Sequence, residues 1–152
     1  MTDALFYHLE RQPLDAVLPG LVERTLARGW RAVIQAGSQE RVEALDTLLW
    51  TYSEESFLPH GTQADGSQAL QPVFLTLDHD NPNGATVRFL VDGASPPAAD
   101  ALRAYQRIVV LIDGRDDAAV AQARATWKLV KTAGFDATYW QQSAAGRWEK
   151  KA

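Results

Sequence analysis

The feature that most constrains the fold is a strand followed directly by a helix in the last third of the chain. Ile108 to Ile112 form an unbroken apolar run rich in β-branched residues, which is typical of a strand buried on both faces of a sheet. Asp116 and Asp117 can cap the N-terminus of the helix that follows and complement its dipole, and Gly134 ends that helix. The segment therefore predicts one strand–helix unit whose strand lies inside a sheet.

The predicted helix carries three basic side chains, Arg124, Lys128 and Lys131, which we call the basic strip. Their spacing by four and then three residues places them within roughly one 60° stripe, at about 100° per residue. Val120 and Trp127 border this stripe, between it and the buried face of the helix. The strip is either a site for an acidic partner or an ordinary solvent-facing side, in which lysines near the C-terminus complement the helix dipole.

Charge is distributed unevenly along the chain. The protein has 15 basic and 19 acidic residues, a net charge of −4. Residues 107–152 contain eight basic and five acidic side chains, a charge of +3, so residues 1–106 carry −7. Nucleic-acid-binding domains are usually strongly basic, so this distribution favours one acidic partner, with direct DNA contact weak or absent. Binding of single-stranded DNA through the basic strip and the tryptophans is a weaker alternative.

Length and composition indicate a single domain over residues 1–152. A chain of 152 residues with 46% hydrophobic composition can bury a sizeable core. It has no cysteine, which excludes disulfides, thiol catalysis and cysteine-ligated metal centres, and fits a reducing compartment. No apolar run approaches the roughly 18 residues of a membrane span, and the N-terminus does not have the pattern of a signal peptide. We therefore expect a cytoplasmic protein.

The first half of the chain alternates between strand and helix patterns. Strands are predicted at residues 4–9 and 31–36, with a helix over 13–29 between them. A second helix follows Ser38, its predicted N-cap. This alternation favours a parallel sheet covered by helices.

The second half adds shorter elements. Strands are predicted at residues 73–77 and 86–91, separated by a seven-residue turn that is too short for a crossover helix. These two strands form either an antiparallel hairpin or neighbours joined through a loop. A short helix over 98–105 and a last strand over 137–141 follow, before a turn and a charged tail at about 143–152.

Residues 48–67, which we call the aromatic segment, place Trp50, Phe57 and Pro59 among polar side chains. A long loop inside a compact domain is uncommon unless it is functional or disordered. The aromatic segment is therefore either a partner surface or a loop folded back over the core. Exposed apolar side chains indicate a binding surface only when they are contiguous.

Catalytic motifs are missing from the sequence. It contains no phosphate-binding P-loop, no dinucleotide fingerprint and no G-x-S-x-G elbow. Asp113, Asp116 and Asp117 cluster after the predicted strand, where open α/β sheets bind ligands, and could hold a magnesium ion. Capping accounts for two of them without a metal, and no histidine has a second one at ligand spacing. A magnesium-dependent phosphoesterase remains the alternative function, although we expect no metal or cofactor.

Several stretches of the sequence resemble the chi subunit of the bacterial DNA polymerase III holoenzyme. They are FYHL, LDTLLWTYSEESFLPHG, VVLIDG, ARATWKLVKTAGFDATYWQQ and the C-terminal TYWQQxxxGRWEKK pattern, so the resemblance covers nearly the whole chain. It implies a Rossmann-like three-layer α/β fold, with a mostly parallel sheet and helices on both faces, and no catalytic activity. It also implies an adaptor in the clamp-loader complex, which bridges the acidic C-terminal tail of single-stranded DNA-binding protein to the psi subunit during DNA replication.

The resemblance places the tail-binding site on the basic strip. Arg124 and Lys128, extended by Lys131, match the family's basic residues for the carboxylates of the tail. Val120 and Trp127 stand where an apolar wall for the terminal phenylalanine would lie. Arginine can bind a carboxylate bidentately and lysine adds a point charge, so we expect a small, salt-sensitive interface of micromolar affinity.

The resemblance places a second partner site in the aromatic segment. Trp50, Phe57 and Pro59 match the part of the family that faces psi or a competing helicase partner. This match favours the partner-surface interpretation of the segment over the alternative that it covers the core.

Overall fold

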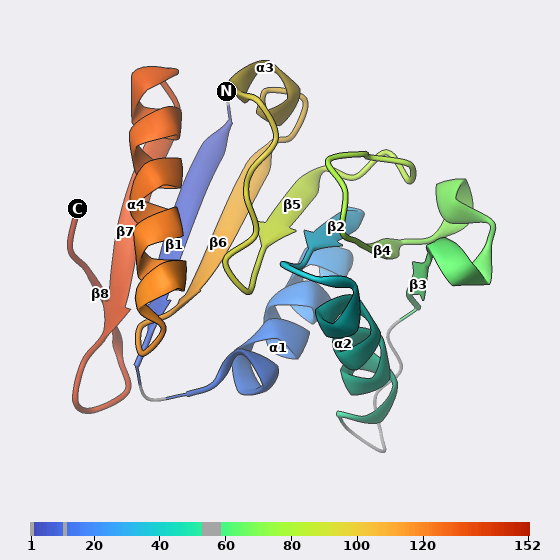
Figure 1. The fold of residues 1–152 in the computed structure, drawn as a ribbon, viewed down its shortest axis with the longest axis horizontal. Helices are drawn as coiled ribbons and strands as arrows, with labels where there is room; N and C mark the ends of the chain where they lie inside the picture. Colours follow the sequence, from blue (N-terminus) through green and yellow to red (C-terminus); the bar gives the residue numbers. More distant parts are fainter. Residues whose placement is uncertain (1, 11, 53–58) are drawn as a thin grey trace.

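The computed structural model describes residues 2–10, 12–52 and 59–152, which fold around one eight-stranded sheet (Figure 1). The strand order is β3-β4-β2-β5-β6-β1-β7-β8, and every neighbouring pair is parallel except β7 and β8. The elements are β1 (Asp3–Leu9), α1 (Leu14–Ala27), β2 (Ala32–Gln35), α2 (Gln39–Thr51), β3 (Gly61–Thr62), the 3-10 turns η1 (Gln63–Asp65) and η2 (Gln68–Leu70), β4 (Val73–Thr76), β5 (Val87–Leu90), α3 (Ala99–Leu102), β6 (Arg107–Asp113), α4 (Asp117–Thr132), β7 (Asp136–Gln142) and β8 (Trp148–Lys150).

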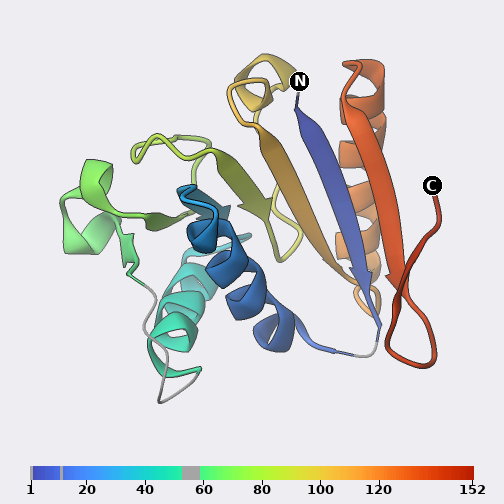
Figure 2. The same cartoon turned by 180° about the vertical axis from the view of Figure 1, so that it is seen from behind.

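Helices lie on both faces of the sheet, as Figures 1 and 2 show. Helices α1 and α2 pack on one face, where Leu18, Val22 and Leu45 join the inward side chains of β2, β4 and β5. Helix α4 packs on the other face, where Ala123 and Val130 meet side chains of β1 and β6. The predicted single α/β domain, with a mostly parallel sheet between helices, is confirmed.

The two predicted helix caps are confirmed. Ser38 accepts a hydrogen bond from the backbone N–H of Arg41 at the start of α2. Asp116 accepts hydrogen bonds from the N–H groups of Ala118 and Ala119 at the start of α4. Each cap satisfies N–H groups that have no partner within the helix, which fixes where the helix begins.

The expected arrangement of β4 and β5 is wrong. The two strands are parallel, and they lie on opposite sides of β2 rather than next to each other. Each has only four residues, so the connection 77–86 returns along the sheet and crosses β2 without a helix. Asn83 holds the far end of this connection, because its side-chain amide donates to the backbone oxygens of Ala32 and Gln71.

Arg88 on β5 anchors the connection 77–86 through hydrogen bonds. Its side chain is fully buried, and its guanidinium donates to the backbone oxygens of Asp78 and Asp80, at 2.6 and 2.8 Å. It also donates to Oε1 of Gln35 and to the hydroxyl of Tyr105. A buried charge is tolerated when all its donors are satisfied, as they are here. Arg88 therefore links the crossover loop to β5, to Gln35 of β2 and to Tyr105.

The C-terminal residues, expected as a turn and a charged tail, fold back onto the sheet. The backbone N–H of Ser143 donates to the oxygen of Arg147 at 2.7 Å, and β8 pairs antiparallel with β7. Trp148 lies against Tyr7 of β1, with ring centroids 5.0 Å apart. Two charged residues of this segment, Glu149 and Lys150, therefore belong to an edge strand.

Candidate partner-binding sites

The basic strip lies along the exposed side of α4. All three members, Arg124, Lys128 and Lys131, are exposed, and none of them forms an ion pair with any residue that the structure describes. Nζ of Lys131 lies 5.7 Å from the ring centroid of Trp127, within the range of a cation–π contact. The structure thus brings the predicted basic residues together, with their charges directed to solvent rather than to a neighbouring carboxylate.

Trp127 and Val120, the predicted apolar wall, are half-buried beside the strip. The ring of Trp127 packs edge-on against Phe6 of β1 at 5.1 Å and against Tyr139 of β7 at 5.9 Å. Much of the Trp127 ring therefore packs in the core between α4 and the sheet. The part that remains accessible borders Arg124 and Lys131.

Tyr139 extends this flank of the strip into a polar network. Its hydroxyl lies 2.7 Å from Nδ1 of His8, and Nε2 of His8 lies 3.5 Å from Oε1 of Glu10. Burial raises the pKa of Tyr139, while the positive charge of Arg124 lowers it and Glu10 raises it further. Arg124 therefore acts electrostatically on the same ring that supports Trp127.

The other flank of the strip borders an apolar cavity that the sequence analysis missed. This cavity is a shallow, open depression between α3 and α4, and it is lined by Ala99, Asp100, Arg103, Ala125, Lys128, Leu129, Thr132 and Ala133. Ala125, Leu129 and Ala133 recur every four residues, and this apolar row was the available sequence signal. Only the fold adds Arg103, which lines the cavity and donates to the backbone oxygen of Ala133. Lys128 thus belongs both to the basic strip and to the lining of this apolar depression.

Two of the three aspartates considered for magnesium have structural partners. Asp116 caps α4, and Oδ1 of Asp113 accepts the backbone N–H of Arg115 at 3.0 Å. Among the described residues, no group of three or more histidine, aspartate or glutamate side chains is arranged to hold a metal ion. The structure therefore offers no observation in favour of the phosphoesterase alternative.

The second candidate site lies at the end of α2. Trp50 is 50% exposed, and Pro59 is also exposed, whereas Phe57 lies outside the described residues. His60 lies beside Trp50, with its side chain fully buried and its ring centroid 4.5 Å from that of Trp50.

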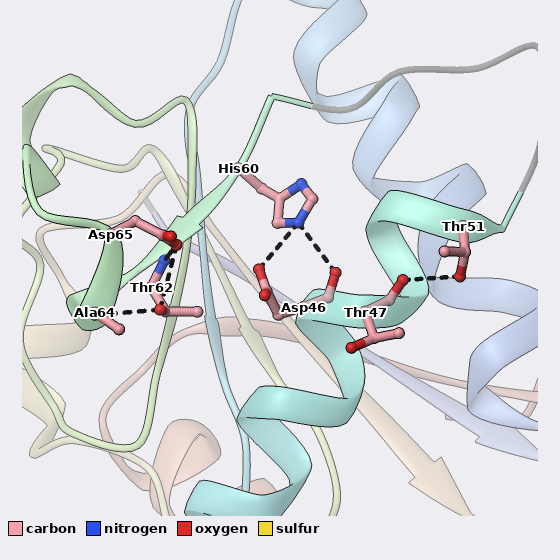
Figure 3. A network of polar contacts seen from close by, with 7 residues as sticks. All are labelled: Asp46, Thr47, Thr51, His60, Thr62, Ala64 and Asp65. Carbon is pink, nitrogen blue, oxygen red and sulfur yellow. Dashed lines mark hydrogen bonds and ion pairs between the residues drawn. The ribbon is translucent and has the colours of Figure 1, made fainter.

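Figure 3 shows His60 directed toward Asp46 of α2. Its Nε2 is 3.1 Å from both the backbone oxygen and Oδ1 of Asp46. One N–H group can point well at only one acceptor, so the carbonyl takes the hydrogen bond and Oδ1 contributes an electrostatic contact. His60 therefore attaches its part of the aromatic segment to α2, the helix that carries Trp50.

Comparison with known proteins identifies the family to which the chain belongs. The model of the family described as "DNA polymerase III chi subunit, HolC" matches residues 1–138. This chain belongs to the DNA polymerase III chi subunit family. The chain is also similar to the "Probable DNA polymerase III subunit chi" of Rickettsia prowazekii (strain Madrid E), with 27% identity over 111 residues, covering 70% of this chain and 67% of the relative.

Membership of the chi family makes this chain an accessory subunit of the DNA polymerase III holoenzyme, with a role in DNA replication. The family match ends at residue 138, so β8 lies beyond it. In the described parts of the chain, no helix is both long and apolar enough to cross a membrane.

Proposed function

We propose that this chi-family protein is a non-catalytic adaptor that binds the acidic C-terminal tail of single-stranded DNA-binding protein through the basic strip. The observation that carries the proposal is a row of three exposed cations on α4 with no described counter-charge, placed between a half-buried tryptophan and an apolar cavity. An acidic peptide that ends in phenylalanine needs this combination of positive charge and apolar space.

The chemistry of such a tail fits the two kinds of surface. Arg124 can bind a carboxylate through two parallel N–H donors, and Lys128 supplies a second positive charge near the cavity. The terminal ring can enter either flank: the edge formed by Val120 and Trp127, or the cavity beside Leu129. Because the cations are exposed, the affinity should be micromolar and should fall as salt increases.

We further propose that the end of α2 binds the psi subunit, or a helicase that competes with psi, and so connects the tail to the clamp loader. Trp50 offers a large exposed ring, Pro59 is also exposed, and the buried His60 packs against the ring of Trp50. Tryptophan is among the residues that most often dominate the binding energy of an interface. A holoenzyme subunit with these partners would work in the cytoplasm.

Fluorescence anisotropy of a labelled acidic tail peptide tests the first site. The Arg124→Ala, Lys128→Ala double variant should lose most of the binding, because removing one charged hydrogen bond costs about 1.5 to 3 kcal/mol. The Arg147→Ala, Lys151→Ala variant is the matched control, since it removes two exposed positive charges that lie outside the basic strip.

Each outcome has a distinct meaning. Retention of wild-type binding by the Arg124, Lys128 variant, with an unchanged circular dichroism spectrum, would move the site away from the basic strip. An equal loss of peptide binding in the control variant would show that the interaction depends on the net charge of the protein rather than on the basic strip. A wild type that does not bind the peptide would remove the adaptor proposal.

A further inference from the structure

No helix in the described parts of the chain covers one half of the sheet face that carries α1 and α2. Figure 2 shows β6, β1 and β7 in front, with α4 behind them and α1 lying to one side over the neighbouring strands. Parallel sheets are usually covered on both faces, so this exposed half is informative. Leu5, Tyr7, Thr138 and Trp140 point to this side, and all four are half-buried rather than buried.

Two adjoining cavities lie between α1 and this open half of the sheet. One has a volume of 210 Å³ and the other 300 Å³, and they share Tyr7, Leu21 and Arg24 as lining residues. Arg28 and Arg107 complete the wall of the smaller cavity, and Trp148 lines the larger one. The β8 strand, through Trp148, therefore forms part of the larger cavity.

Three guanidinium groups line the smaller cavity without a counter-charge. Arg24, Arg28 and Arg107 make no ion pair with any described residue, although Asp3 is the register partner of Arg107 on β1. Nε of Arg107 is buried and has no hydrogen-bond acceptor among the residues that the structure describes. The guanidinium of Arg107 is therefore not neutralised by a neighbouring carboxylate in the described parts of the chain.

Two of the three arginines are held in place by an aromatic ring. The guanidinium carbons of Arg28 and Arg107 lie 5.0 and 5.4 Å from the ring of Trp30, so one indole ring positions two positive charges. The hydroxyl of Tyr7 lies within the field of Arg107 and Arg24, whose charges oppose the rise that burial causes in its pKa. The cavity thus combines fixed cations with a phenolic donor.

We propose that this cavity binds a phosphate group, presented by a mononucleotide or by single-stranded DNA. Guanidinium forks match the oxygens of phosphate, and three of them supply more positive charge than one carboxylate requires. The adjoining cavity, beside the rings of Tyr7 and Trp148, offers an aromatic surface for a base. The site lies on the opposite face of the sheet from α4, so it is separate from the site proposed for the acidic tail.

Isothermal titration calorimetry on the full chain tests this proposal with three probes: inorganic phosphate, thymidine monophosphate and a short oligothymidylate. The variant is Arg24→Gln, Arg28→Gln, because both side chains are exposed and neither belongs to the core. It should bind the nucleotide probes at least about tenfold more weakly than the wild type, as expected when charged hydrogen bonds are lost. The Arg124→Gln, Lys128→Gln variant loses the same charge on the other face and should bind them like the wild type.

The probes also separate the two sources of phosphate. Tighter binding of thymidine monophosphate than of the oligomer supports a free nucleotide, and the reverse order supports single-stranded DNA. The proposal is overturned if the wild type binds none of the three probes, or if the Arg24, Arg28 variant binds them equally well. It is also overturned if a polyglutamate peptide binds at these arginines while the phosphate probes do not.

Discussion

The hydroxyl of Tyr139 on β7 lies 2.7 Å from Nδ1 of His8 on β1. This contact joins two neighbouring strands directly beneath the flank of α4 that carries Trp127. The phenol is therefore occupied within the fold, and its contribution to the tail site is to support the tryptophan ring.

Alkaline pH should weaken the fold through this buried phenol. Burial raises the pKa of Tyr139 above the ordinary value, so the folded state favours the neutral form. The resulting stabilisation is complete below about pH 10, the unfolded value, and is lost as the pH rises through the folded pKa. Urea unfolding between pH 8 and pH 11 should show a smaller loss of stability for Tyr139→Phe than for the wild type. Parallel losses in the two proteins would contradict the expectation.

Replacement of the buried arginine should be among the most damaging single changes. Arg88→Met leaves Oε1 of Gln35 and the backbone oxygens of Asp78 and Asp80 without their donor. We expect the free energy of unfolding to fall by about 3 to 5 kcal/mol, measured by chemical denaturation. Arg147→Met, at an exposed position, serves as the control and should change stability by less than about 0.5 kcal/mol.

Geometry should matter as well as charge in the basic strip. Arg124→Lys keeps the charge but removes the bidentate fork, so the acidic tail peptide should bind about three to ten times more weakly. The salt dependence should stay unchanged, because the number of cations is the same. Anisotropy titrations at two salt concentrations separate these effects. A lysine variant that binds as tightly as the wild type would reduce the role of Arg124 to a point charge.

The buried histidine should support the second partner site. His60→Ala removes the hydrogen bond to Asp46 and the packing under Trp50, which should destabilise the fold by about 1 to 3 kcal/mol. It should also weaken binding of a psi subunit, measured by calorimetry. His79→Ala is the control, because that histidine is exposed on the crossover loop. Equal psi binding by the wild type and His60→Ala would show that the aromatic segment binds without this support.

The local elements of the fold could be predicted from the sequence because their determinants are local. The apolar run at Ile108 to Ile112 indicated a buried strand, and Ser38 and Asp116 marked helix starts that the structure confirms. The basic strip was also predictable, because the periodicity of a helix fixes which side chains share a face.

The order of the strands in the sheet, and the side-chain contacts between residues distant in sequence, were decided by the tertiary structure alone. Nothing in the spacing of residues 73–77 and 86–91 indicated that β2 would lie between them, or that Arg88 would hold the crossing loop. Contacts such as that of Arg107 with Trp30 join residues far apart in the chain. They depend on packing energies summed over the whole sheet, which no local pattern records. The sequence by itself therefore determined most of the helices and longer strands, the family and one charged surface, while the open sheet face and its arginines exist only in the folded chain.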